Sequence, residues 1–224
     1  MSEARQEPDL TLLDLVPRGI FVGTSLILRQ GDRFLYGMRP AKQEQGRLVI
    51  ELTGIGGGIE EGDGSFEAGV RREAVEEVAS DVELIPCRET LVVRGEKNLE
   101  WIALMGGEHP AAVVFRNYRT PAHQPWHERN SGQGCLIVYL ADLKCRPWPV
   151  SELPWLMWLS PEQILQTARQ DVGLDALIES GATLVIGRFD PPASGRWGRL
   201  TDSQEALGIA LGDELPEFYR SLGR

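Results

Sequence analysis

Glu73, Glu76 and Glu77 are the residues whose type and spacing best suit chemistry. On a helix with about 100° per residue, Glu76 and Glu77 fall roughly 300° and 40° from Glu73, so an arc of about 100° holds all three carboxylates. Like charges on one helical face repel one another, which favours a positive partner. Hard divalent cations such as Mg²⁺ bind carboxylate oxygens, and two such ions can hold a diphosphate between them. The spacing therefore predicts a divalent-metal site for phosphate chemistry.

The residues beside these glutamates support the same interpretation. Arg72 lies one helical turn before Glu76, where a pair at positions i and i+4 can hold that carboxylate in one rotamer. Gly56, Gly57 and Gly58 permit positive φ and close approach of the backbone, so a main-chain carbonyl or amide could join the site. The alternative is an acidic helix face that only meets solvent. A glycine loop running directly into the acidic helix favours the metal site.

The helix itself is predicted over residues 65–78. Ser65 is the expected N-cap, and Glu67 lies in the first turn, where the helix dipole favours an anion. The opposite side of the helical wheel should face the core. The residues predicted for that side are Ala68, Ala74, Val75, Val78 and Ala79.

Strand patterns surround this helix on both sides. They are predicted at residues 19–29, 33–39, 47–52, 81–94, 101–106, 111–116 and 135–143. Ser160 and Pro161 mark the start of a second helix that runs to about Arg169. The order of elements indicates an α+β or mixed α/β fold. The tail over 171–224 either finishes the same domain or covers a neighbouring subunit.

Composition places the chain among ordinary globular proteins. Of its 224 residues, 42% are hydrophobic and 25% are charged, which excludes a mostly disordered chain, a coiled coil or a collagen-like fibre. The net charge of -10 disfavours non-specific binding to a nucleic acid duplex. No apolar run is long enough for a membrane span and no signal peptide is evident, so we expect a cytoplasmic protein without a membrane partner.

The three cysteines and three histidines do not indicate zinc chemistry. Cys87, Cys135 and Cys145 lack the spacing of a zinc site or a disulfide framework, so we expect reduced cysteines in the core. The histidines are not placed at metal-ligand spacing with any cysteine. The glycine loop also lacks the patterns of a P-loop or a Rossmann nucleotide site.

The stretch GGGIEEGDGSFEAGVRREAVEEVA, residues 56–79, resembles the signature box of the Nudix hydrolases. By this resemblance Glu73, Glu76 and Glu77 take the positions of the metal-binding glutamates. Arg72 takes that of the orienting arginine, and Gly58 lies in the loop that lends a backbone contact. The catalytic set implied is therefore Arg72 with the three glutamates, and the metal set is the glutamates with Gly58.

The resemblance also implies an architecture. We expect a Nudix-type α/β/α sandwich with a mixed β-sheet over residues 19–170. An N-terminal arm would cover residues 1–18, and a C-terminal extension would cover 171–224. That extension would pack on the same domain or on the partner in a possible homodimer.

Two departures from the box are visible. Asp63 stands for the first glutamate, and eight residues rather than seven separate it from Arg72. Ala79 and Ser80 stand where the family has glycine and an apolar residue. The central REAVEE is intact.

The resemblance implies hydrolysis of a phosphoanhydride bond in a nucleoside diphosphate linked to another group, with Mg²⁺ or Mn²⁺ as cofactor. The partner is then a small nucleoside diphosphate derivative. The general base stays open among Glu76, Glu77, His127 and Glu128. The alternative function is a non-catalytic module that binds a nucleotide or sugar-nucleotide, suggested by the insertion before the helix.

A long segment over residues 116–134 mixes cations with aromatic residues. This composition suits binding of a phosphate and stacking of a base, although an ordinary surface loop has a similar composition. The candidate substrate-binding residues are Arg116, Arg119, Trp126, His127 and Glu128.

Two further aromatic features have alternative interpretations. The sequence GRWGR, residues 195–199, is either a turn that contacts an anion or a plain turn packed on Trp197. Trp148, Trp155 and Trp158 lie near two prolines, and core or subunit packing is favoured over stacking on a substrate.

Overall fold

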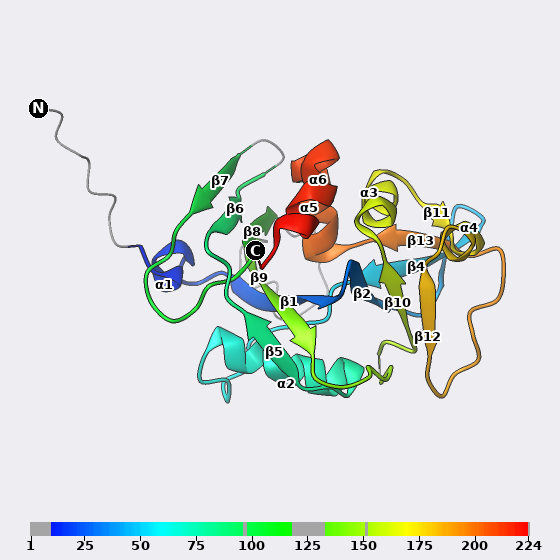
Figure 1. The fold of residues 1–224 in the computed structure, drawn as a ribbon, viewed down its shortest axis with the longest axis horizontal. Coiled ribbons are helices and arrows are strands. Elements are labelled where there is room, and N and C mark those ends of the chain that lie inside the picture. The colour runs from blue at the N-terminus through cyan, green and yellow to red at the C-terminus, as the bar shows by residue number, and fades with distance from the viewer. Residues whose placement is uncertain (1–9, 96–97, 118–132, 151, 224) are drawn as a thin grey trace, which may run out of the picture.

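The computed structural model describes residues 10–95, 98–117, 133–150 and 152–223, and its arrangement of helices and strands is shown in Figure 1. The strands of this part of the chain are β1 Phe21–Gln30, β2 Arg33–Met38, β3 Lys42–Glu44, β4 Arg47–Thr53, β5 Val82–Ile85, β6 Thr90–Val93, β7 Leu99–Ile102, β8 Ala112–Asn117, β9 Gln133–Leu143, β10 Trp155–Leu159, β11 Val172–Gly173, β12 Thr183–Ile186 and β13 Trp197–Leu200. The helices are α1 Leu12–Leu15, α2 Phe66–Val78, α3 Pro161–Arg169, α4 Leu174–Glu179, α5 Asp202–Leu211 and α6 Leu215–Ser221, with a 3₁₀ turn η2 at Gly212–Glu214.

The strands form one mixed sheet in the order β11-β13-β4-β2-β1-β9-β8-β6-β7. Off this path, β10 pairs with β2 and β12, β3 pairs with β4, and β5 pairs with β9. The central strand β1 runs antiparallel to β2 and parallel to β9. The sheet is therefore mixed, as predicted.

Helices cover both faces of this sheet. Because side chains alternate along a strand, Leu26 and Leu28 of β1 face α2, where they join Val70 and Val78 in one hydrophobic cluster. Ile27 faces the other way and joins the cluster that α3, α5 and α6 cover. Figure 1 shows α2 on one side of the sheet and these three helices on the opposite side. The predicted α/β/α sandwich is confirmed.

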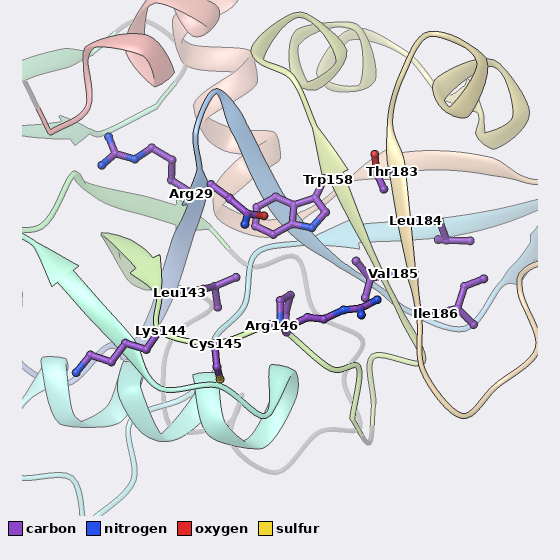
Figure 2. A pocket seen from close by; sticks show the side chains of 12 residues that line it. Arg29, Leu143, Lys144, Cys145, Arg146, Trp158, Thr183, Leu184, Val185 and Ile186 are labelled. Carbon is purple, nitrogen blue, oxygen red and sulfur yellow. The ribbon is translucent and has the colours of Figure 1, made fainter.

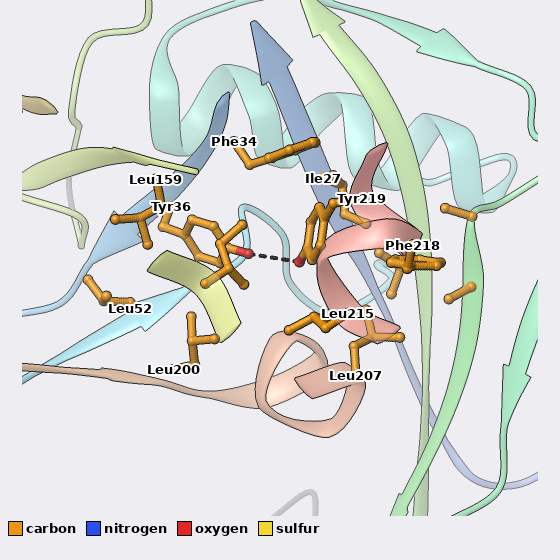
Figure 3. Packing of buried hydrophobic residues seen from close by; sticks show 14 of the residues in the cluster. Ile27, Phe34, Tyr36, Leu52, Leu159, Leu200, Leu207, Leu215, Phe218 and Tyr219 are labelled. Carbon is orange, nitrogen blue, oxygen red and sulfur yellow. Dashed lines mark hydrogen bonds between the residues drawn. The ribbon is translucent and has the colours of Figure 1, made fainter. Parts of the chain in front are cut away.

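The C-terminal residues from 171 onward pack on this same sheet. Strand β13 runs parallel to β4, and α5 and α6 close the cluster on the face away from α2. Tyr219 of α6 meets Tyr36 of β2 there, with 2.8 Å between the two hydroxyl oxygens (Figure 3). Phe34 packs edge-on against Tyr219 at 4.6 Å between ring centroids. The tail therefore contributes both strands and core side chains to the domain.

Helix α2 begins as the sequence predicts. The Ser65 hydroxyl accepts a hydrogen bond from the backbone N–H of Ala68 at 3.1 Å, which satisfies one of the free donors of the first turn. The helix ends at Ala79, which adopts a left-handed φ of 49°. Local polar chemistry therefore fixes both ends of the helix that carries the glutamates.

The predicted core stripe of α2 is partly wrong. The buried residues are Gly69, Val70, Ala74 and Val78. Val75, by contrast, is 51% exposed, and Ala68 and Ala79 are also exposed. The real stripe follows i, i+4 and i+8 spacing from Val70, and Val75 lies on its flank.

Residues 197–199 of the segment GRWGR lie in a strand, which corrects both interpretations for this part, and only Gly195, with a φ of 76°, lies in a bend. Trp197–Leu200 form strand β13, whose parallel pairing with β4 joins residues about 150 positions apart in the sequence. Arg199 donates to Asp171 at 2.7 Å and to Glu44 at 2.6 Å. This arginine ties strand β13 to its neighbours and does not lie in an anion-binding turn.

The tryptophans and cysteines considered above differ in whether their side chains are buried. Trp158 is buried in β10, whereas Trp148 is exposed. Cys87 and Cys135 are buried free thiols, and burial raises their pKa values to about 11 and about 12. Cys145 is exposed, so the expectation of a core position is wrong for this cysteine.

The helices of the described part of the chain are all shorter or more polar than a membrane-crossing helix must be.

Candidate active site

The glycine loop is held directly against strand β1. The backbone N–H of Thr24 donates to the carbonyl of Gly57 at 2.8 Å, and Ile59 donates to Val22 at 3.3 Å. Gly56 has a φ of 152°, and a Cβ at this position would lie 2.1 Å from the carbonyl oxygen of Thr24. A side chain at position 56 therefore cannot fit without moving the loop.

Arg72 connects this loop with the acidic face of α2. Its Nη2 donates to the carbonyl of Gly58 at 3.0 Å, and its Nη1 donates to Glu73 Oε1 and to Glu76 Oε2, both at 2.9 Å. Nε and Nη2 donate to the two carboxylate oxygens of Asp63 at 3.2 and 3.1 Å. The Arg72 guanidinium thus holds Gly58 in the glycine loop, Asp63 after that loop, and two of the three glutamates.

Asp63 keeps its contact with Arg72 despite the extra residue between them. Its carboxylate also accepts the backbone N–H of Glu60 at 2.9 Å. The hydrogen bonds from Arg72 and then from Glu60 lower the pKa of Asp63. The insertion before the helix therefore does not disconnect the loop from α2.

Glu77 is the most enclosed of the three glutamates. Its Oε2 accepts the backbone N–H of Gly56 at 2.8 Å. Burial raises the pKa of Glu77 to about 7, and the hydrogen bond from Gly56 opposes this rise.

Glu73 lies against the glycine loop as well. A Cβ at Gly57 would lie 2.5 Å from its Oε1, so the absence of a side chain at position 57 makes room for this carboxylate. Burial raises the pKa of Glu73, and the hydrogen bond from Arg72 opposes the rise. The Glu73 carboxylate therefore occupies space that a side chain at position 57 would fill.

These groups open into one cavity of about 490 Å³. Its lining residues are Arg39, Gly56, Gly57, Glu73, Glu76, Glu77 and Glu152. Within the part of the chain that the structure describes, four carboxylates line this cavity with one guanidinium, that of Arg39, so the cavity carries an excess of negative charge. The three glutamates predicted from the sequence thus line the same cavity.

Sequence reasoning missed Arg39 and Glu152. Arg39 follows strand β2, and its backbone N–H donates to Glu51 at 3.0 Å, which places it beside β4. The segment before Glu152 is attached to the end of α2, since Trp148 donates to Val78 at 2.9 Å and Val150 to Glu77 at 3.2 Å. These contacts join distant segments, so no local motif could have identified either residue.

The donor set of the cavity suits a hard divalent cation, because it consists of carboxylate oxygens. The space that Gly57 leaves for Glu73 is consistent with a site built around these oxygens. Within the described residues, however, no three acidic, histidine or cysteine side chains converge on one point. Arg72 holds Glu73 and Glu76, and Gly56 holds Glu77. Glu76 is 55% exposed on its side chain, so it can turn from Arg72 toward a cation.

The remaining predicted residues lie elsewhere. The carbonyl of Gly58 accepts from Arg72 and does not line the cavity, so its metal contact stays a prediction. Arg116 pairs with Glu205 at 2.8 Å and lines a separate cavity. Four predicted residues fall outside the described part of the chain, and their roles stay predictions. They are Arg119, Trp126, His127 and Glu128.

A family model described as the NUDIX domain matches residues 20–180 of this chain. The match covers well over half of the sequence and includes the glycine loop, α2 and Glu152. The chain therefore belongs to the NUDIX domain family, and this membership supports a hydrolase.

Solved structures with similar folds were also found. The E. coli ORF135 protein is 18% identical, with 66% of this chain and 78% of that chain covered and a TM-score of 0.43. A NUDIX hydrolase from Nitrosomonas europaea is 11% identical, with 92% and 91% covered and a TM-score of 0.43. A NUDIX-family hydrolase from Clostridium perfringens is 17% identical, with 67% and 87% covered and a TM-score of 0.39. The comparison with curated proteins gave no match.

Proposed function

We propose that this protein hydrolyses a phosphoanhydride bond in a nucleoside diphosphate linked to another group, with Mg²⁺ or Mn²⁺ as cofactor. The observation that carries the proposal is the cavity in which Glu73, Glu76 and Glu77 line one wall beside the glycine loop. Membership of the NUDIX family agrees with it.

The three glutamates are the residues that would hold the cations. Divalent ions bound there would neutralise the phosphates and lower the pKa of the attacking water. Arg72 positions Glu73 and Glu76 through its hydrogen bonds, and the Gly56 N–H positions Glu77. Glu73 and Glu77 are thus oriented before substrate binds, which lowers the cost of assembling the site, whereas the exposed Glu76 would turn from Arg72 toward the cation.

Arg39 and Glu152 complete the proposed site. Arg39 is the lining cation of the carboxylate cavity, so we assign it to a phosphate oxygen of the substrate. Glu152 adds a further candidate for the general base to Glu76, Glu77, His127 and Glu128. Its place in the cavity wall, together with the three glutamates, supports this candidate.

The test is a panel of nucleoside diphosphate derivatives, incubated with the protein in Mg²⁺, in Mn²⁺ and in EDTA. We expect phosphate-containing products from at least one derivative, with the activity lost in EDTA and restored by excess Mg²⁺. Binding without cleavage would instead raise the melting temperature and leave the derivative intact. That result across the whole panel would favour the non-catalytic binding module.

A further inference from the structure

A second and larger cavity lies away from the glutamates, beside the ends of β9 and β12. It measures about 770 Å³, within the range of small-molecule sites. Figure 2 shows its side chains, which come from the end of β1, the segment after β9, and strands β10 and β12. No described residue lines both this cavity and the one lined by Glu73, Glu76 and Glu77, which we call the carboxylate cavity. We call the larger cavity the β12 cavity.

The β12 cavity is basic, although the whole chain carries a net charge of -10. Arg29, Lys144 and Arg146 line it, and none of the described residues that line it is acidic. Arg29 is partly neutralised, because it pairs with Asp142 at 3.3 Å and donates to the carbonyl of Leu222 at 3.0 Å. Among the described residues, the side chains of Lys144 and Arg146 have no ion-pair partner. The cavity therefore holds positive charge that an anion would balance.

The rest of the wall is mainly apolar, with Gln30 and Thr183 as its polar residues. Trp158 is only 7% exposed, so its indole is held by the core while contributing to the wall of the cavity. Val185 lies on the same face of the sheet, because it pairs with Leu156, two residues from Trp158. In Figure 2 the Arg146 side chain extends along this wall toward Val185. A cation beside an apolar surface suits a ligand that has one anionic end and one flat, apolar part.

We propose that the β12 cavity binds a small organic phosphate that carries a planar ring, of about the size of a nucleoside monophosphate. Lys144 and Arg146 would contact the phosphate, and Trp158 and Val185 would contact the ring. This binding needs neither a divalent cation nor the glutamates of α2. Its test is therefore independent of the proposed hydrolysis.

The test is isothermal titration calorimetry in EDTA with three probes: adenosine 5′-monophosphate, inorganic phosphate and adenosine. The full-length protein is compared with Arg146→Ala and with the double variant Lys144→Ala, Arg146→Ala. Arg88→Ala is the matched control, because Arg88 is an exposed arginine outside the lining. Circular dichroism melts establish that every variant is folded.

We expect saturable binding of the monophosphate, and weaker binding of both phosphate and adenosine. Arg146→Ala should weaken monophosphate binding at least about tenfold, the double variant should weaken it further, and Arg88→Ala should leave it unchanged. Unchanged binding of the monophosphate by the folded double variant would place the ligand elsewhere and overturn the proposal. Adenosine binding as tight as the monophosphate, or no saturable binding of the monophosphate, would overturn it as well.

Discussion

The two helical layers of this sandwich are attached to the sheet by different means. Helix α2 buries mainly small residues, Val70, Ala74 and Val78 among them, and its outward side is fixed by Arg72. The opposite layer buries large side chains, including Leu207, Leu215, Phe218 and Tyr219. Hydrogen bonds to charged groups depend on geometry, whereas apolar burial depends mainly on area. The comparison indicates that α2 is built to position carboxylates and the other layer to supply stability.

The strongest test of this difference between the two helical layers is to neutralise one carboxylate of α2. Glu76→Gln keeps the size of the side chain and removes the charge that a cation would need. We expect hydrolysis to fall by about 10²- to 10³-fold, with the melting temperature nearly unchanged because Glu76 is exposed. Steady-state rates in Mg²⁺ measure the effect.

The matched control for that variant is Glu83→Gln, since Glu83 is exposed on β5, outside the cavity. It should retain full activity. An equal loss of activity in both variants would contradict the assignment of Glu76.

A substitution in the opposite layer should lower the stability of the fold and leave the rate of hydrolysis unchanged. Leu207 of α5 is fully buried, so Leu207→Ala leaves a cavity in the core. We expect the free energy of unfolding to fall by about 2–5 kcal/mol, measured by urea denaturation. Hydrolysis at a temperature well below the melting point should be unchanged. A large loss of activity in the folded variant would show that the two layers are not separate in function.

A smaller effect on chemistry is expected from Arg72, which positions two of the glutamates. Arg72→Ala should lower kcat by about 10- to 100-fold, as removal of a positioning group does. Arg72→Lys should rescue little, because an ammonium cannot reproduce the two-point contact with Asp63.

The adjacent Arg71 provides the control for this variant. Its guanidinium donates to the carbonyl of Val82 at 2.7 Å and does not touch the glutamates. Arg71→Ala should therefore leave kcat unchanged. Equal effects of the two alanine variants would argue against a positioning role for Arg72.

The smallest effect concerns a surface contact at the far end of the sheet. The hydrogen bonds from Arg199 lower the pKa of Asp171 below its ordinary value of 3.8, so this pair stabilises the fold when Asp171 is ionised. That contribution is present above about pH 3.8 and is lost as the pH falls through the lowered pKa. Asp171→Asn should therefore cost less than about 1 kcal/mol at pH 7.

The two proteins should converge in stability in strong acid, where the Asp171 carboxyl of the wild-type chain is protonated. Chemical denaturation across pH measures the difference, and Asp32→Asn, in the exposed turn after β1, is the control. If the difference in the free energy of unfolding between the two proteins grew as the pH fell, it would contradict this prediction.

The parts of this structure that the sequence predicted are local. The Ser65 cap, the extent of α2 and the crowding of Glu73, Glu76 and Glu77 all follow from neighbours within a few residues. The strand patterns predicted most of the sheet for the same reason. Helix and strand periodicity act over one or two turns, and such signals can be read without knowing the rest of the fold.

The parts that were missed depend on distant contacts. Arg39 and Glu152 reach the cavity only because β2 lies beside β4 and because the segment after β9 is attached to α2. Trp197–Leu200 become a strand through pairing with β4, although the glycines of GRWGR favour a turn locally. The prediction that Val75 faces the core failed for the same reason. The elements that pack against a helix determine which side of its apolar stripe is buried, and these elements are distant in the sequence.

The central claim is that Glu73, Glu76 and Glu77 hold divalent cations together. The most direct test is a Mn²⁺ titration followed by electron paramagnetic resonance, which detects the free ion, on the wild-type protein and on the double variant Glu73→Gln, Glu76→Gln. We expect saturable Mn²⁺ binding to the wild-type protein and binding at least about tenfold weaker to the variant. Equal Mn²⁺ binding by two correctly folded proteins would contradict the claim.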